Sequence, residues 1–248
     1  FKRTSQSNYR HKLILQLCPY LKLNLMKKNA VVVAGGNGLR MGAFIPKQFL
    51  LLKGKPLLWY TLNTFLEAYD DMQVILVLPE EHIERGEAIV NELSDSKRVV
   101  ITKGGATRYH SVQNGLKLVA ESSIVFVHDG VRCLISKELI QRCYEQAVIK
   151  GSAIPAVAAT DSIRIAVDDD ASVVADRTKV RIIQTPQTFK SEIIVPAFNQ
   201  PYSDAFTDEA TVVEAFGTAV FLVDGDYNNI KVTRPVDLVI AEKILEEL

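Results

Sequence analysis

Two patterns of apolar and polar positions alternate along the chain from residue 29 onward. Short apolar runs rich in Val and Ile predict buried strands at residues 30–33, 74–78, 98–102 and 123–127. Between them, apolar residues recur at helical spacing and predict helices at residues 56–69, 80–93, 107–120 and 136–148. This alternation predicts an α/β protein with a doubly wound, mostly parallel sheet, in which ligands bind at the carboxyl ends of the strands.

The alternation changes after residue 153. Strand-like residues 153–159 and 162–167 are followed by a turn of three aspartates and a further strand-like run at 172–175, which together predict an inserted β-hairpin arm at about residues 156–182. Because an isolated two-stranded hairpin is marginally stable, we expect a second subunit to cover it. The chain continues with an expected helix at 207–216, a strand at 219–223 and a helix at 235–248.

Composition places the chain among ordinary globular proteins. Of 248 residues, 48% are hydrophobic and 23% charged, and no apolar stretch reaches the roughly 18 residues that a membrane span needs. Lys+Arg and Asp+Glu are both 29, so the net charge does not indicate a nucleic-acid partner. Three cysteines without metal-ligand spacing are typical of a reducing compartment, and we expect the cytoplasm.

The first 28 residues differ from the rest in charge, since they contain seven Lys or Arg and no acid. We interpret residues 1–28 as a basic N-terminal extension outside the core, with Met26 close to the natural start. An organellar transit segment is the alternative, because such segments are also basic and poor in acids. The core domain is then expected at residues 29–248.

A glycine-rich loop with two cations follows the first expected strand. Its glycines let backbone N–H groups approach an anion closely, and Arg40 and Lys47 follow in the same loop. Met41 stands where a dinucleotide-binding fingerprint has its third glycine, and no Gly-Lys-Ser/Thr follows to make a P-loop. The loop therefore favours a nucleotide triphosphate held by the two cations, with solvated surface residues as the alternative. Its small residues are Ala34, Gly35, Gly36, Asn37 and Gly38.

Two further turns at expected strand ends carry candidate ligand-binding residues. Gly105, Arg108 and Ser111 belong to a glycine turn that enters a helix, where free amides bind polar groups and a serine can reach a base edge. Asp129 ends a buried strand and is suited to Mg²⁺ or a sugar hydroxyl, since nucleotide-bound Mg²⁺ commonly takes one or two carboxylates. The alternatives are an ordinary turn capped by Thr107 and a helix-capping role for Asp129.

Taken together, these motifs resemble those of the 2-C-methyl-D-erythritol 4-phosphate cytidylyltransferases, over nearly the whole span from residue 29 to 248. Spaced motifs in a fixed order are far more specific than any single one. In chain order they are Ala-Gly-Gly-x-Gly-x-Arg-Met from residue 34, Pro-Lys-Gln from 46, Gly-Gly-x-x-Arg-x-x-Ser from 104, Val-His-Asp from 127, Asp-Arg from 176, Gln-Thr-Pro-Gln from 184, Thr-Asp-Glu-Ala from 207 and Asn-Ile-Lys-Val-Thr-Arg-Pro from 229.

The resemblance implies a Rossmann-like nucleotidyltransferase that transfers CMP from CTP to 2-C-methyl-D-erythritol 4-phosphate, with Mg²⁺ as cofactor and pyrophosphate as by-product. It also implies a homodimer in which the arm is exchanged, so that Arg177 serves the partner's site. The implied catalytic residues are Arg40, Lys47, Arg177 and Lys231. The implied nucleotide-binding residues are Ala34, Gly35, Gly36, Asn37, Gly38, Gly105, Arg108, Ser111, Asp129 and Gly130. The implied acceptor-binding residues are Asp129, Arg132, Ser162, Arg177, Thr185 and Lys231, with Asp129 also at the metal.

The chain departs from the family pattern at a few positions and leaves other functions open. Ser162 replaces a common Thr, Ala106 replaces a common acid, and residues 130–133 read Gly-Val-Arg-Cys where Ala-Ala-Arg-Pro is common. The main alternative is a ribitol-5-phosphate cytidylyltransferase, which differs only in its acceptor. The glycine turn at 104–111 disfavours a sugar-1-phosphate nucleotidyltransferase that uses UTP or GTP. Retained cations on both substrate sides disfavour a non-catalytic nucleotide-binding regulator.

Overall fold

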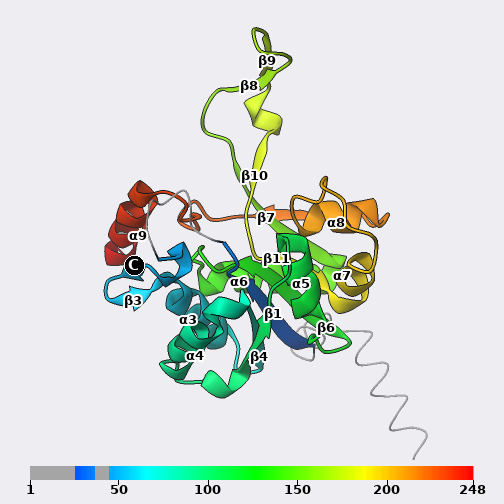
Figure 1. Ribbon diagram of the computed structural model, residues 1–248. Coiled ribbons are helices and arrows are strands. Elements are labelled where there is room, and N and C mark those ends of the chain that lie inside the picture. The colour runs from blue at the N-terminus through cyan, green and yellow to red at the C-terminus, as the bar shows by residue number, and fades with distance from the viewer. Residues whose placement is uncertain (1–25, 37–44, 248) are drawn as a thin grey trace, which may run out of the picture.

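The computed structural model describes residues 26–36 and 45–247. Its centre is an eight-stranded sheet with the strand order β10-β7-β11-β6-β1-β4-β5, in which β12 also pairs with β7 (Figure 1). Strands β5, β4, β1 and β6 are parallel, and β11 runs antiparallel between β6 and β7. The predicted α/β fold with a mostly parallel sheet is therefore confirmed. The strands are β1 (Lys27–Val33), β4 (Met72–Leu78), β5 (Val99–Lys103), β6 (Ser123–Asp129), β7 (Ser152–Ala158), β10 (Arg181–Ile183), β11 (Gln187–Lys190) and β12 (Leu222–Asp224).

Helices cover both faces of this sheet, as the doubly wound pattern predicts. Successive residues of β1 alternate between the two faces, because side chains on a strand point to opposite sides. Ala30 and Val32 join one apolar cluster, and Val31 and Val33 join the other. The first face carries α3 (Leu57–Ala68), α4 (Ile83–Asn91) and α6 (Lys137–Lys150), and the second carries α5 (Arg108–Leu116), α7 (Ser191–Ala197) and α8 (Glu209–Ala215).

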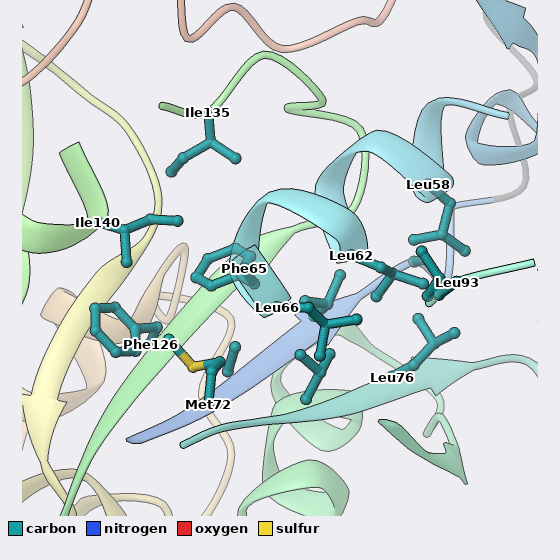
Figure 2. Close-up of a cluster of buried hydrophobic side chains, with 14 of the residues drawn as sticks. Leu58, Leu62, Phe65, Leu66, Met72, Leu76, Leu93, Phe126, Ile135 and Ile140 are labelled. Atoms are coloured by element: carbon teal, nitrogen blue, oxygen red, sulfur yellow. The ribbon is translucent and has the colours of Figure 1, made fainter. Parts of the chain in front are cut away.

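Helix α3 places one apolar stripe against the sheet. Its buried residues recur three or four positions apart, so they share one helix face and meet strand side chains (Figure 2). Burial of each large side chain stabilises the fold by about 1.5–3 kcal/mol. This packing holds the helix firmly beneath the strands that carry the candidate site. The stripe is Leu58, Leu62, Phe65 and Leu66, and it packs with Met72, Leu76 and Phe126.

A small apolar cluster joins the hairpin at residues 51–56 to the last helix of the chain. Strands β2 (Leu51–Leu52) and β3 (Lys55–Pro56) form a hairpin, and Leu52 shares an apolar cluster with α9 (Pro235–Glu247). Lys53 Nζ, in the turn of the hairpin, lies 2.6 Å from Glu246 Oε1. Val232 N donates to Val131 O at 3.1 Å, next to this cluster. That bond brings the segment containing Lys231 to the carboxyl end of β6.

The first strand begins at Lys27, two residues before the expected start of the core domain at residue 29. Lys28 is only 3% exposed, and its Nζ lies 3.0 Å from Asp71 Oδ2 and 4.8 Å from the ring centres of Tyr69 and Tyr144. A buried ammonium is stabilised by such a carboxylate and by aromatic faces, which no linear pattern of charges reveals. Residues 1–25 lie outside the described residues.

The inserted arm is shorter than the sequence pattern predicts. Residues 153–158 belong to β7, whose first five residues are buried in the main sheet, so they are not part of the projecting hairpin. The hairpin itself consists of β8 (Ile163–Ala166) and β9 (Ser172–Ala175), which project well beyond the sheet (Figure 1). Its base is formed where β10 pairs with β7.

Two other elements differ at their ends from the predicted ranges, and short 3₁₀ turns occur at several element ends. The expected helix at 80–93 is the turn η3 (Glu80–His82) followed by α4, and the expected strand at 219–223 is β12, at 222–224. The remaining turns are η2 (Lys47–Phe49), η4 (Ser96–Arg98) and η5 (Arg177–Lys179). Within the described part of the chain, no helix has the length and apolarity that crossing a bilayer requires.

Candidate active site

A cavity of about 590 Å³ opens at the carboxyl ends of β1, β4, β5 and β6. This is the edge at which doubly wound sheets bind their ligands. Segments far apart in the sequence converge here, because parallel strands deliver their following loops to one edge. The expected site residues that line the cavity are Ala34, Gly35, Gly36, Lys47, Gly105, Arg108, Ser111, Asp129 and Lys231.

The other expected site residues do not line this cavity. Gly130, Arg132 and Thr185 lie behind Asp129 and are bonded to the strand ends. Ser162 and Arg177 are exposed on the arm, where Arg177 Nη1 donates to Thr160 O at 2.9 Å. These two arm residues are therefore not brought to the cavity of their own chain. Asn37, Gly38 and Arg40 lie outside the described residues.

The loop after β1 is tied to its neighbours at both ends. Ala34 N donates to Val77 O at 3.0 Å, and the buried Gln48 side chain donates from Nε2 to Ala34 O at 2.8 Å. A Cβ atom at Gly36 would lie 3.4 Å from Lys47 Cε. The lysine stem therefore passes directly beside the glycine backbone, in the wall of the cavity.

The glycine turn after β5 is closed by its own side chains. Gly105 N donates to Ser111 Oγ at 3.0 Å, and Ser111 Oγ donates to Thr107 O at 3.0 Å. A Cβ atom at Gly105 would lie 2.4 Å from His110 Cβ, so only glycine fits there. Thr107 caps α5. Because the hydroxyl hydrogen of Ser111 is used within the turn, this serine can offer a ligand only its remaining acceptor capacity.

Asp129 is surrounded by three cations. Lys231 Nζ lies 2.9 Å from Asp129 Oδ2, Arg108 Nε lies 3.3 Å from Oδ1, and Arg132 Nε lies 3.7 Å from Oδ2. Burial alone would raise the pKa of Asp129, but Arg108, Lys231 and Arg132 outweigh it and hold that pKa well below its ordinary value. The carboxylate is thus charged at any physiological pH.

A buried histidine and threonine support the backbone of Asp129. Thr185 Oγ1 accepts from Asp129 N at 3.1 Å and donates to His128 Nδ1 at 3.0 Å, and His128 Nε2 donates to Arg132 O at 3.2 Å. Burial lowers the pKa of His128 to about 4, although Asp129 opposes the shift. The imidazole is therefore neutral, and Thr185 acts on the strand end from behind the cavity.

Glu209 is a charged residue that sequence reasoning did not single out. It is 1% exposed and holds Arg108 through both carboxylate oxygens, with Nη2 3.1 Å from Oε2 and Nη1 bonded to Oε1. Burial opposes the charge of Arg108, but Glu209 and Asp129 raise its pKa above the ordinary value. An acid in the first turn of a helix is common, so nothing local distinguishes Glu209. Its membership of the Thr-Asp-Glu-Ala motif was the one available signal.

The carboxylates of the cavity suit a metal ion that arrives with phosphates. Among the residues that the structure describes, no three His, Cys, Asp or Glu side chains converge on a common point. Asp129 lies at the end of β6, within the lining of the cavity. A single carboxylate fits Mg²⁺, because this ion keeps water and substrate phosphates as most of its ligands.

The open sheet, with a cavity lined by charged side chains at its carboxyl edge, defines an α/β protein of the doubly wound class. The family model for 2-C-methyl-D-erythritol 4-phosphate cytidylyltransferase matches residues 29–247. Proteins of that name from Bacteroides fragilis and Bacteroides thetaiotaomicron are 42% and 44% identical to this chain, covering 89% of it and 100% of each relative. The chain therefore belongs to the 2-C-methyl-D-erythritol 4-phosphate cytidylyltransferase family, as the resemblance of its motifs predicts.

Solved structures of the same family share the fold. The 4-diphosphocytidyl-2C-methyl-D-erythritol synthase from Anaerococcus prevotii matches with a TM-score of 0.76 at 27% identity, covering 89% of this chain and 99% of that one. The 2-C-methyl-D-erythritol 4-phosphate cytidylyltransferase from Thermus thermophilus matches with a TM-score of 0.68 at 30% identity, covering 87% of this chain and 98% of that one. The Rossmann-like architecture is thus shared over nearly the whole described chain.

Proposed function

We propose that this chain transfers the cytidylyl group of CTP to the phosphate of 2-C-methyl-D-erythritol 4-phosphate. Membership of the family supports the reaction, since its relatives carry that activity in their names. The observation that carries the proposal in the structure is the cavity at the strand ends, in which Lys47 lines the wall and Arg108 and Lys231 pair with Asp129. A transfer between two phosphates needs cations on both sides of the reacting phosphorus.

The proposed reaction is a single in-line displacement. An oxygen of the acceptor phosphate attacks the α-phosphorus of CTP, a new P–O bond forms, and the bond to the β-phosphate breaks with release of pyrophosphate. The second pKa of a phosphate monoester is about 6, so the attacking oxygen is already largely deprotonated at pH 7 and needs no general base. The work left to the protein is to position the two phosphates and to balance developing negative charge.

The described cations divide between the two substrates. Lys47, beside Gly36, neutralises charge on the CTP phosphates in this proposal, together with Arg40 of the same loop. Lys231, which pairs with Asp129, directs the acceptor phosphate. Its ammonium is 2.9 Å from the Asp129 carboxylate and its side chain is 43% exposed, so it can turn to a phosphate while Arg108 and Arg132 still pair with Asp129.

Magnesium is proposed as the cofactor, held by Asp129 and by the phosphates of CTP. When bound there, Mg²⁺ supplies a positive charge that polarises the phosphoryl oxygens. Lys231 would then turn its ammonium toward the substrate phosphates, while Arg108 stays bonded to Asp129 and Glu209.

A homodimer in the cytoplasm completes the proposal. The arm exposes Ile165 and Val173, which are 57% and 51% accessible, and such an apolar hairpin is stable only when another surface covers it. In the dimer, Arg177 reaches the partner's cavity and contacts the acceptor phosphate with Ser162.

Cys133 and Cys143 are buried free thiols, which supports a reducing compartment.

A pyrophosphate-release assay tests the proposed reaction. Purified protein with Mg²⁺ is given each of the four nucleoside triphosphates, in combination with 2-C-methyl-D-erythritol 4-phosphate or ribitol 5-phosphate. We expect the fastest release with CTP and the methylerythritol acceptor. Faster turnover with ribitol 5-phosphate would overturn the acceptor assignment, and no release with any pair would indicate a nucleotide-binding protein without activity.

A further inference from the structure

Glu209 is a buried carboxylate that the proposed reaction leaves without a task. It does not belong to the cavity lining, yet both of its oxygens bond to the guanidinium of Arg108, which does. The side chain of Glu209 is 1% exposed, whereas that of Arg108 is 33% exposed. A buried carboxylate is costly unless paired, so its placement behind a cavity residue calls for a functional explanation.

The position of Arg108 on its helix creates a need for an anchor. Arg108 is the first residue of α5, after the cap Thr107. A cation at this position is repelled by the partial positive charge of the helix N-terminus. A long arginine side chain also loses rotamer freedom when it is held in one place. Without carboxylates to hold it, the guanidinium would turn away from the helix end and out of the cavity.

Glu209 can hold the guanidinium of Arg108 in one place because its own position is fixed. It begins α8, which is capped by Asp208 in a reciprocal capping box with Thr211. The buried Gln187, at the start of β11, accepts from Ala210 N at 2.7 Å and donates to Asp208 Oδ2 at 2.8 Å. The start of α8 is therefore bonded directly to the central sheet, and the carboxylate of Glu209 is held with it.

The hydrogen bonds of Arg108 leave part of its guanidinium available. Glu209 takes one N–H from each of Nη1 and Nη2, and Asp129 takes the N–H of Nε. A guanidinium has five N–H donors, so two remain for a ligand in the cavity. We infer that Glu209 is a positioning residue that fixes the Arg108 guanidinium so that its remaining donors bind a phosphate of CTP.

This inference rests on the proposed use of CTP, and a binding experiment separates the two. The affinity for CTP with Mg²⁺ is measured by titration calorimetry without acceptor, for the wild type, Glu209→Gln, Glu209→Asp and the control Glu214→Gln. Glu214 is an exposed acid of the same helix. We expect both Glu209 variants to bind CTP about 10-fold or more weakly, because small displacements of a positioning group have large effects. The control is expected to stay within about twofold of the wild type.

Three further measurements distinguish positioning from a merely structural role. Glu209→Asp keeps the charge that Arg108 needs, so it remains folded if Glu209→Gln does not, and urea unfolding checks both. In steady-state assays we expect KM for CTP to rise and KM for the acceptor to stay unchanged. On an Arg108→Met background, Glu209→Gln should change CTP affinity by less than about twofold, since its partner is already gone.

The outcomes are distinct. Wild-type affinity in Glu209→Asp, an equal rise in both KM values, or a full additional loss on the Arg108→Met background would each overturn the positioning role and leave the proposed function intact. Failure of the wild type to bind CTP at all would overturn the proposed function together with this inference.

Discussion

Two charged side chains of the cavity, and the turn that carries a third, are held by residues that other elements fix in place. Asp129 is held from behind by Thr185, and Arg108 is held by Glu209. Lys47 precedes Gln48 in a short turn, and the side-chain amide of Gln48 donates to Ala34 O. Preorganised charges stabilise a transition state without further rearrangement. The effect of removing one of them should therefore fall mainly on the reaction step.

Replacement of Lys47 tests whether removal of one cavity charge acts mainly on the reaction step. We expect Lys47→Ala to lower kcat by about 10²–10³-fold, because one electrostatic group at a developing charge is worth that much. The affinity for CTP should change by only about threefold, since other groups of the cavity also bind the phosphates. Steady-state kinetics and CTP titration measure the two quantities. Lys55→Ala is the control, because Lys55 is 43% exposed and pairs with Glu92 outside the cavity. A rise in KM at unchanged kcat would show that Lys47 only binds CTP.

The buried imidazole of His128 makes a pH-dependent contribution to stability. Its pKa is about 4 in the folded protein, against about 6.5 for an exposed histidine. A lowered pKa means that the contribution is complete above pH 6.5 and is lost as the pH falls toward 4, about 3 kcal/mol in total. We therefore expect the gap in unfolding free energy between wild type and His128→Gln to shrink by that amount between pH 7 and pH 4.

Urea unfolding at several pH values measures this gap directly. Other groups, including the carboxylates around Arg108, titrate in both proteins and cancel in the difference. His82→Gln is the matched control, since His82 is only partly buried and lies at a helix start away from Asp129. A gap for His128→Gln that stays constant with pH would show that the imidazole is not held neutral by burial.

At the scale of elements, the local pattern predicts the parts whose partners are close in sequence. The parallel strands, the helices between them and the loops at their carboxyl ends follow from apolar periodicity and glycine placement. The cap Ser136, which accepts from Leu139 N at 3.2 Å, was also predictable. Consequently the edge of the sheet that carries the cavity could be predicted and, with the motifs of the family, so could nine of the residues that line it.

Other elements depend on partners that the local pattern does not contain. Residues 153–158 look like one strand of a hairpin, but they pair with β11 and β12, which come much later in the chain. Lys28 resembles part of a basic extension, but Asp71 and two tyrosine rings give it a place in the core. The pair of Arg108 and Glu209 spans 101 residues. Charged pairs of this kind can be recognised only when the fold has brought their two residues together.

At the scale of the whole molecule, the arm is the feature that a single chain does not complete. In β8 and β9, cross-strand register places Ile163, Ile165, Val173 and Ala175 on one face of the hairpin. Ile165 and Val173 are more than half exposed on that face. Strands β8 and β9 project far from the main sheet (Figure 1). An unpartnered apolar face on a projecting hairpin is a surface for a second subunit. In the proposed dimer it also carries Arg177 to the partner's cavity.

The dimer can be tested by a pair of substitutions on opposite faces of the hairpin. We expect Ile165→Glu to yield a monomer, because it buries a charge in the proposed interface. Ser172→Asp, on the other face, should leave the dimer intact. Sedimentation equilibrium measures both. A dimer that persists in Ile165→Glu would place the interface elsewhere on the chain.

Complementation between two inactive variants tests whether Arg177 acts in the partner's site. Lys47→Ala damages the cavity of its own chain, and Arg177→Ala removes only the arm cation. When the two proteins are mixed and allowed to exchange subunits, half of the dimers are mixed, and each mixed dimer has one intact cavity if Arg177 acts across the interface. Activity should then return to about one quarter of the wild-type value, measured by pyrophosphate release. If Arg177 serves its own chain, no cavity is intact in any dimer. The mixture would then stay as inactive as the separate variants, and the exchanged arm would be ruled out.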